Sequence, residues 1–313
     1  MISSLLALMT AMSIEQAPAP GVSALRVYGQ NVPIQVTVVQ YGPDKSEIIK
    51  PPIKKNPSNL GIATTGKSVF VADVASGGIL YAKAPHEQRS IASLTKLMTA
   101  IVALENESNL KQEMTFQDSD FDHQGEAVFQ SGDTLTRGEV LRAMLVGSVN
   151  AAANMLARTS HLTREDFVQR MNEKARDLHL NSMKFADPSG LNSQNKSDAA
   201  DIAALATLAL NNPDIRKAMT EPEVSVTTKA GKAYDIKSTN LLLTSFLNKD
   251  PYKIVGAKTG SLPEAGYCLA QVTKDKQGHE IVAVLLGSDN HFSRYNDVKA
   301  LTSWAFDSYQ WAN

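Results

Sequence analysis

The hydrophobic period of the chain changes from strand-like to helical and back again, and the order of these changes limits the folds that it can adopt. Residues 68–74 and 79–84 alternate between apolar and polar positions, and the Ala-Ser-Gly-Gly between them is typical of a hairpin turn. Residues 97–215 have mostly helical periodicity, and alternation returns after Glu223 in three further segments. Two strands, a long helical insertion and three strands predict an α+β fold, with a mostly antiparallel sheet and a helical subdomain inserted in it.

Several signals divide the helical part of the chain. Residues 91–104 are apolar on nearly every side, which predicts a helix enclosed by protein. Thr136 and Thr163 each stand before a helical pattern, as N-cap residues do. A further helical segment ends at Asn-Asn-Pro, residues 211–213, and residues 295–306 predict an amphipathic helix that closes the chain.

The first 58 residues differ from the rest. Residues 5–12 form a short apolar stretch followed by small residues and prolines, as in the core of a secretory signal, although no basic residue precedes Arg26. This stretch is too short to span a bilayer as a helix. Residues 32–41 predict one strand, and the Pro- and Lys-rich segment after it predicts a linker. We therefore expect an exported protein with a boundary near Ser58 and one domain over residues 59–313.

Charge and cysteine content exclude several classes of function. The chain has 31 Lys and Arg against 32 Asp and Glu, so no global positive field is present to hold nucleic acid or an anionic membrane. Its single cysteine, Cys268, excludes an internal disulfide framework and a thiolate metal cluster. The alternation around Cys268 predicts a buried small hydrophobe. The six histidines form no short ligand pair, so zinc hydrolysis lacks a set of ligands.

A Ser-x-x-Lys pair in a helix places a hydroxyl and an amine on one face, one turn apart. The spacing occurs three times, at Ser93/Lys96, Ser108/Lys111 and Ser193/Lys196. The second and third pairs lie in polar stretches that are typical of a solvated surface. Lys96 lies at the start of the apolar helix, where it either extends to solvent or loses part of its hydration and becomes neutral. In the second case it would be a general base beside a nucleophile.

Two tripeptides add to this pair. Ser-x-Asn occurs four times, beginning at Ser148, Ser193, Ser238 and Ser288. Only Ser148-Val149-Asn150 lies at a break between two apolar helical segments, where a loop could present a hydroxyl and an amide to a cleft. Lys-Thr-Gly occurs once, at Lys258-Thr259-Gly260, and its glycine would let a ligand approach the strand backbone closely.

In chain order, the Ser-x-x-Lys pair at Ser93, the tripeptide at Ser148 and the Lys-Thr-Gly at Lys258 match the signature of serine penicillin-binding proteins and β-lactamases. The chain resembles the low-molecular-mass penicillin-binding proteins, the D-alanyl-D-alanine carboxypeptidase and endopeptidase family, from about residue 68 to its end. The resemblance implies the fold of that superfamily, in which N- and C-terminal helices flank the sheet and an all-helical subdomain, here about 97–215, is inserted.

The resemblance also implies a reaction on peptidoglycan stem peptides and roles for single residues. Ser93 would attack the carbonyl of the penultimate D-alanine, Lys96 would take its proton, and Ser148 would relay a proton to the leaving amine. The backbone N–H groups of Ser93 and Ser261 would form the oxyanion hole. The substrate amide and terminal carboxylate would be held by the remaining site residues, which are Asn150, Lys258, Thr259 and, as a helper, Arg294. No metal or organic cofactor is implied, and β-lactams would be covalent inhibitors.

Three features depart from the family pattern. Val149 stands where the family more often has glycine, which bears on how the substrate fits. Larger relatives continue into a β domain with an amphipathic anchor, so no C-terminal membrane anchor is expected here. Residues 185–192 contain no Glu that could activate a deacylating water as in class A β-lactamases, so we do not expect efficient β-lactam hydrolysis.

Other hypotheses stay open. Endopeptidase action on peptidoglycan cross-links is the second enzymatic one, and a non-catalytic wall-binding protein is the second class. Residues 61–68, Gly-Ile-Ala-Thr-Thr-Gly-Lys-Ser, match the phosphate loop of P-loop NTPases. That loop needs a buried strand before it and a helix after it, whereas a Lys-, Asn- and Pro-rich segment precedes this match and a strand follows. An NTPase is therefore a remote hypothesis, and a glycine turn that enters a strand is the ordinary interpretation.

Overall fold

The structure is a computed structural model, and it describes residues 26–29, 32–35, 49–122 and 127–312. Strands β1 (Arg26–Gly29) and β2 (Val32–Gln35) pair antiparallel. Strand β2 begins where the predicted strand over residues 32–41 begins, and the remainder of that prediction lies outside the described residues. The apolar stretch of residues 5–12 lies outside them as well.

The central sheet has five antiparallel strands, which are β4 (Ser68–Asp73), β5 (Ile79–Lys83), β12 (Lys253–Leu262), β13 (Gly266–Lys274) and β14 (Glu280–Ser288). Their order across the sheet is β12-β13-β14-β4-β5. Strands from before and after the helical insertion therefore meet where β14 pairs with β4. This arrangement confirms the predicted α+β fold with a mostly antiparallel sheet.

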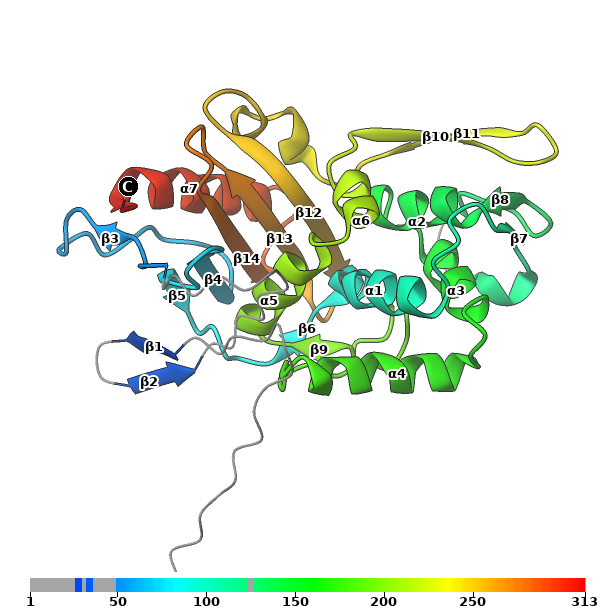
Figure 1. The fold of residues 1–313 in the computed structure, drawn as a ribbon, viewed down its shortest axis with the longest axis horizontal. Coiled ribbons are helices and arrows are strands. Elements are labelled where there is room, and N and C mark those ends of the chain that lie inside the picture. Colours follow the sequence, from blue (N-terminus) through cyan, green and yellow to red (C-terminus); the bar gives the residue numbers. More distant parts are fainter. Residues whose placement is uncertain (1–25, 30–31, 36–48, 123–126, 313) are drawn as a thin grey trace, which may run out of the picture.

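Side chains of the central strands alternate between two cores, because successive residues of a strand point to opposite faces. In β14, Val284 lies in the core on the side of α5 (Ala199–Ala209), whereas Leu285 lies in the core on the side of α7 (Ser293–Ser308). Figure 1 shows α5 and α7 on opposite faces of the sheet. Cys268 is fully buried in the first of these cores, and burial raises the pKa of its thiol to about 11, which confirms the prediction of a small hydrophobe.

The other helices lie between β5 and β10 in the sequence and are α1 (Lys96–Asn106), α2 (Arg137–Val146), α3 (Asn150–Arg158), α4 (Arg164–Asp177) and α6 (Pro213–Ala218). Both predicted N-caps are confirmed, since the hydroxyl of Thr136 accepts the N–H of Glu139 and that of Thr163 accepts the N–H of Asp166. Among the described residues, no helix has the length and apolar character that a membrane crossing needs. Helices α1 to α4 extend to one side of the sheet (Figure 1).

The helix predicted over residues 91–104 is two elements. Ala92–Thr95 form a 3-10 turn, η1, and α1 continues from it at Lys96. Ala92 has a φ of +46°, which an α-helix does not allow, so the prediction of one helix was wrong at its start. Ser93 therefore lies in the 3-10 turn, while Lys96 begins the α-helix.

Residues before the sheet contain no helix where the structure describes them. Residues 49–67 carry three prolines and two glycines, which oppose helix formation, and their one regular element is the short strand β3 (Ile53–Lys54). The expected N-terminal flanking helix is thus absent from the described residues that precede β4, whereas α7 is the expected C-terminal one. Helix α7 also confirms the prediction over residues 295–306.

Short two-stranded ladders complete the fold. They pair β3 with β15 (Tyr309–Gln310), β6 (Arg89–Ser90) with β9 (Lys196–Ser197), β7 (Glu113–Thr115) with β8 (Thr134–Thr136), and β10 (Glu223–Thr227) with β11 (Ala233–Lys237). The ladder of β6 and β9 continues into a bond from the N–H of Ile91 to the carbonyl of Asn195, 3.1 Å long. This bond places the loop before β9 beside η1.

Candidate active site

Ser93 lies where two glycines allow other backbone segments to reach its amide. A Cβ atom on Gly190 would lie 2.2 Å from the carbonyl oxygen of Ala92 and 2.9 Å from the nitrogen of Ser93. A Cβ atom on Gly260 of β12 would lie 3.1 Å from the same nitrogen. Both segments therefore pack against the backbone of Ser93, and larger residues would push them away.

Lys96 is fully buried, and its Nζ atom contacts the hydroxyl of the predicted nucleophile. Nζ lies 2.9 Å from Oγ of Ser93 and 2.7 Å from Oδ1 of Asn150, and it also donates to the carbonyl of Ser189. Burial lowers the pKa of Lys96 from 10.5 to about 7, and the carboxylates of Asp187 and Asp122 oppose that shift. Since the pKa lies near neutrality, the amine can lose its proton and then accept one from Ser93.

The loop over residues 185–195 holds the carbonyl that Lys96 contacts. The Asp187 carboxylate accepts the N–H groups of Ser189 and Gly190, each at 2.6 Å, and the Ser189 hydroxyl at 2.9 Å. Asn195 donates from Nδ2 to the Thr95 hydroxyl at 3.1 Å, which joins the loop to η1. The sequence assigned no site role to these residues, because nothing local in a loop sequence shows which distant side chain its carbonyl will meet.

The second predicted motif lies at the turn between α2 and α3. Ser148 has a φ of +59°, an uncommon conformation for a residue with a side chain, and such conformations concentrate at functional sites. Asn150 begins α3, and its Oδ1 accepts from Lys96. Val149 between them is buried, so it packs against protein while its two neighbours face the other motifs.

The third motif lies on β12, the edge strand of the sheet. Lys258 is buried, and its Nζ atom donates to Oγ of Ser148 at 2.8 Å and to the carbonyl of Thr259 at 2.9 Å. Burial, together with the positive charges of Lys96 and Arg294, holds the pKa of Lys258 well below its usual range. We expected Lys258 to bind a carboxylate, and the structure adds a bond to Ser148 that the sequence did not predict.

The remaining predicted residues surround the same stretch of β12. Thr259 is buried and its Oγ1 lies 2.6 Å from Oγ1 of Thr239, whereas Ser261 is exposed. Arg294 on α7 is buried, donates to the carbonyl of Gly260 at 3.0 Å and to the hydroxyl of Tyr295 at 2.8 Å. Arg294 therefore supports the strand backbone and brings a positive charge close to it.

A groove of about 630 Å³ lies beside the second motif. Its wall includes Ser148 and Asn150, and Asp122, Phe129 and Gln130 extend it along the helical part of the chain. This volume lies within the range of ordinary ligand sites. The second motif, whose Ser148 and Asn150 contact Lys258 and Lys96, thus has adjoining space for an extended substrate.

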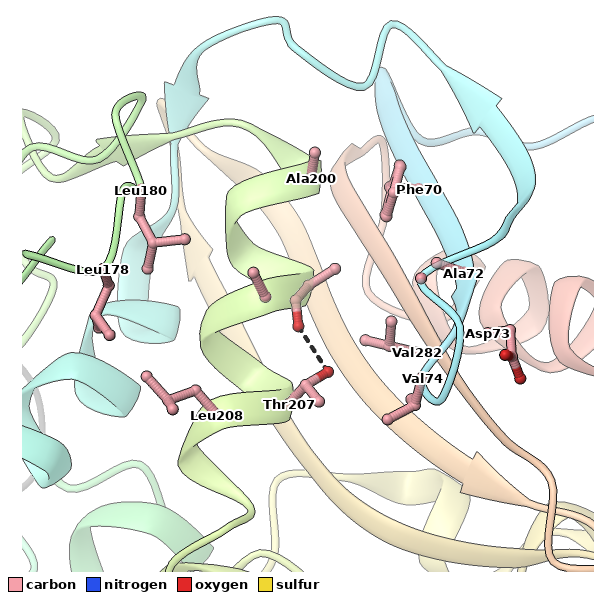
Figure 2. Close-up of a pocket in the computed structure, with 13 residues that line it drawn as sticks. Phe70, Ala72, Asp73, Val74, Leu178, Leu180, Ala200, Thr207, Leu208 and Val282 are labelled. Carbon is pink, nitrogen blue, oxygen red and sulfur yellow. Dashed lines mark hydrogen bonds between the residues drawn. The ribbon is translucent and has the colours of Figure 1, made fainter. Parts of the chain in front are cut away.

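A second cavity, of about 40 Å³, lies between α5 and β4 (Figure 2). Its wall is mostly apolar. The hydroxyl of Thr207 in that wall already donates a hydrogen bond to the carbonyl of Ala203, at 2.9 Å. Figure 2 shows Asp73 on the side of β4 away from α5, where its carboxylate accepts from Trp311 at 2.8 Å. This cavity presents no nucleophile or charge for catalysis.

The two other Ser-x-x-Lys pairs and the phosphate-loop match do not join this site. Ser108 and Lys111 are both exposed, and Lys196 lies in strand β9 rather than on a helix face shared with Ser193. The phosphate-loop match leads directly into β4, its Lys67 is exposed, and the Lys67 N–H donates to the carbonyl of Leu286. Within the described ranges, no three His, Cys, Asp or Glu side chains could hold a metal ion.

Comparisons with known proteins find similar sequences among D-alanyl-D-alanine carboxypeptidases and endopeptidases. A family model described as D-alanyl-D-alanine carboxypeptidase matches residues 54–290. A D-alanyl-D-alanine endopeptidase of Haemophilus influenzae is 34% identical over 221 residues, which make up 70% of this chain and 74% of that protein. The D-alanyl-D-alanine carboxypeptidase DacF of Bacillus subtilis is 29% identical, and the match covers 80% of this chain and 64% of DacF.

Two solved structures extend the likeness to the fold. A DD-transpeptidase of Streptomyces superposes with a TM-score of 0.72 at 28% identity, over 79% of this chain and 99% of that one. A penicillin-binding protein of Listeria monocytogenes in its cefotaxime-bound form superposes with a TM-score of 0.68 at 27% identity, over the same shares of the two chains.

Proposed function

The chain belongs to the D-alanyl-D-alanine carboxypeptidase family of serine peptidases, and we propose that it removes the terminal D-alanine from peptidoglycan stem peptides through an acyl-serine intermediate. The observation that carries the proposal is the bond between Lys96 and Ser93, because an amine with a pKa near 7 lies 2.9 Å from a serine hydroxyl. A nucleophile and a base in hydrogen-bond contact are the minimum for acyl transfer. We propose that the catalytic domain of the protein extends over residues 59–313.

In the acylation step, neutral Lys96 takes the proton of the Ser93 hydroxyl while Oγ attacks the carbonyl carbon of the penultimate D-alanine. The backbone N–H groups of Ser93 and Ser261 stabilise the negative charge that develops on the carbonyl oxygen. Support for this pairing comes from Gly260, which brings β12 to the Ser93 amide. The bond to the terminal D-alanine then breaks and leaves an ester on Ser93.

The leaving amine needs a proton, and in this proposal Ser148 supplies it. Ser148 receives a hydrogen bond from Lys258 at 2.8 Å, so it can donate its own proton and recover one from that amine. A water molecule then attacks the Ser93 ester. The proton that the water loses passes through the same groups to the Ser93 oxygen, so the free serine and the shortened peptide result.

Substrate recognition uses the remaining groups of the site. Thr259 and the positive charge of Arg294 attract the terminal carboxylate, and the negative charge of that carboxylate favours the protonated form of Lys258 against the lowered pKa of this amine. Asn150 holds Lys96 through its oxygen at 2.7 Å, which leaves its amide nitrogen for the substrate backbone. β-Lactams with a carboxylate would acylate the same serine, and the cefotaxime-bound relative supports that extension.

The substrate class also implies a location. Peptidoglycan stem peptides are matured outside the cytoplasmic membrane, so the protein would act in the periplasm or the extracytoplasmic cell envelope. The apolar stretch of residues 5–12 supports export.

The test is the release of D-alanine from a pentapeptide that ends in D-alanyl-D-alanine. Wild-type protein should release it, Ser93→Ala should not, and Ser108→Ala, which changes an exposed serine of a matching Ser-x-x-Lys pair, should be as active as the wild type. A wild type that releases no D-alanine would contradict the proposal.

Endopeptidase activity is the second candidate, because several relatives carry that name. A cross-linked peptide dimer offered in the same assay separates the two activities. Cleavage of the dimer with a higher kcat/KM than the pentapeptide would favour the endopeptidase. A non-catalytic wall-binding protein would cleave neither substrate, and the complete set of reactive groups argues against it.

A further inference from the structure

We propose that Thr239 is a positioning residue that orients the hydroxyl of Thr259 toward the terminal carboxylate, and that it thereby sets the preference for substrates with a free C-terminal carboxylate. Thr239 lies in the third of the four Ser-x-Asn tripeptides, residues 238–240, to which the proposed mechanism gives no role. Its Oγ1 lies 2.6 Å from Oγ1 of Thr259. The inference rests on the proposed function, since it assigns Thr259 to the carboxylate.

The backbone of Thr239 is held from two elements of the site. Its N–H donates to the carbonyl of Val146, at the end of α2, at 3.1 Å. Its carbonyl accepts the hydroxyl of Tyr295, on α7, at 2.7 Å, and Tyr295 in turn accepts from Arg294. Thr239 thus joins the helix before Ser148, the edge strand and the helix that carries Arg294.

The neighbours of Thr239 in the tripeptide fix it further. The N–H of Asn240 donates to Oγ of Ser238 at 3.1 Å, and Oδ1 of Asn240 accepts the N–H of Leu242 at 3.1 Å. Asn240 is buried. Because a threonine side chain is also restricted at χ1, the hydroxyl of Thr239 has little freedom to leave Thr259.

The contact between the hydroxyls of Thr239 and Thr259 affects ligand binding because it decides which hydroxyl proton is free for a ligand. Each threonine hydroxyl has one proton to donate and two lone pairs to accept with. If Thr239 donates to Thr259, the proton of Thr259 is free for a ligand, whereas in the reverse arrangement Thr239 consumes it. A carboxylate only accepts, so it selects the first arrangement, in which Thr239, Thr259 and the carboxylate form a chain of hydrogen bonds that strengthen one another.

The experiment compares ligands that differ only in the carboxylate. One pair is the D-alanyl-D-alanine peptide as free acid and as C-terminal amide, compared by kcat and KM. The other pair is benzylpenicillin and its methyl ester, compared by the second-order rate of acylation in intact-mass spectrometry. The second pair needs only acylation, so it tests Thr239 even where peptide turnover is absent.

The variant Thr239→Val removes the hydroxyl and keeps the shape of the side chain. We expect it to lower the preference for the free acid over the uncharged ligand about tenfold in both pairs, mainly through KM for the peptide, which corresponds to one hydrogen bond to a charged group. Thr239→Ser should keep the wild-type preference. Thr239→Ala replaces the valine variant in the comparison if thermal unfolding shows that valine is not accommodated.

Thr134→Val is a matched control, because its hydroxyl makes the same kind of contact, 2.8 Å from that of Thr115, on exposed strands of the helical part. It should change neither ratio. If Thr239→Val leaves the ratio of acid to uncharged ligand unchanged, with or without an equal loss of rate for both ligands, the inference is overturned, and an equal loss would show a merely structural role. A serine variant that behaves like the valine variant would also overturn it. A wild type that releases no D-alanine but prefers penicillin to its ester would contradict only the proposed function.

Discussion

The Nζ atom of Lys258 lies 2.8 Å from Oγ of Ser148, across 110 residues of sequence. The contact joins the edge strand β12 to the turn between α2 and α3. The amine of Lys96, on a third element, contacts Asn150, the first residue of α3. Two buried amines therefore converge on Ser148 and Asn150, and the positive charge of Lys96 lowers the pKa of Lys258.

This contact predicts different outcomes for two changes of Lys258. Lys258→Arg should keep part of the acylation rate and raise KM about tenfold, because the guanidinium supplies positive charge with a different geometry. Lys258→Met should lose roughly 100-fold in kcat/KM, because it removes the charge and the partner of Ser148. Steady-state kinetics on the D-alanyl-D-alanine peptide measures both. Equal activity of the two variants would contradict a role for the charge.

Ser93 should form a covalent ester with benzylpenicillin. Intact-mass spectrometry should show one adduct on the wild type and none on Ser93→Ala, because the variant lacks the hydroxyl that is the proposed attacking group. Ser193→Ala is the control from another Ser-x-x-Lys pair and should be labelled like the wild type. An adduct that persists in Ser93→Ala would place the nucleophile elsewhere.

Acylation should rise with pH through about 7, the pKa of Lys96. The protonated amine cannot accept the serine proton, so the rate is low below this pKa and reaches a plateau above it. Lys96→Arg should lose at least about 10³-fold at every pH, since a guanidinium stays charged. Stopped-flow acylation measures the profile over a pH range that extends roughly two units to either side of this pKa.

A near wild-type rate in Lys96→Arg would show that Lys96 is a structural cation. Ser148 with a bound water would then be the next candidate for the base.

Gly190→Ala should destabilise the protein and abolish acylation. The new Cβ would lie 2.2 Å from the carbonyl oxygen of Ala92, and the residue has a φ of +87°. Gly231→Ala is the matched control, because Gly231 has nearly the same φ, +86°, and nothing within 4 Å of an added Cβ. It should cost about 1 kcal/mol of stability and leave acylation unchanged. Thermal unfolding and penicillin labelling of both variants test this, and equal effects would contradict the close packing at Ser93.

Lys67→Ala should leave D-alanine release unchanged, because Lys67 is exposed on the segment that enters β4. Its backbone N–H, which any residue but proline retains, makes the contact with the sheet. The prediction is tested by comparing kcat/KM for D-alanine release between Lys67→Ala and the wild type. Hydrolysis of ATP by the wild type that Lys67→Ala abolishes would revive the phosphate-loop hypothesis.

Local signals in the sequence predicted much of the fold. The caps at Thr136 and Thr163 and the alternation of residues 68–74 depend on neighbours a few residues away, and both were found as expected. The prediction failed at Ala92, where a positive φ interrupts the helix. That φ accompanies the packing of Gly190 and Gly260 against the next peptide, which no helical periodicity records.

The sequence by itself determined the order of the central strands and the helical insertion, the three motifs and their resemblance to one family, because these depend on residue type and short spacing. Only the tertiary structure decided which of three Ser-x-x-Lys pairs meets the other motifs, that Ser189 presents its carbonyl to Lys96, and that Thr239 lies against Thr259. Lys96 and Ser189 are 93 residues apart. The low pKa of Lys96 comes from burial by all these segments together, and burial exists only when the chain has folded.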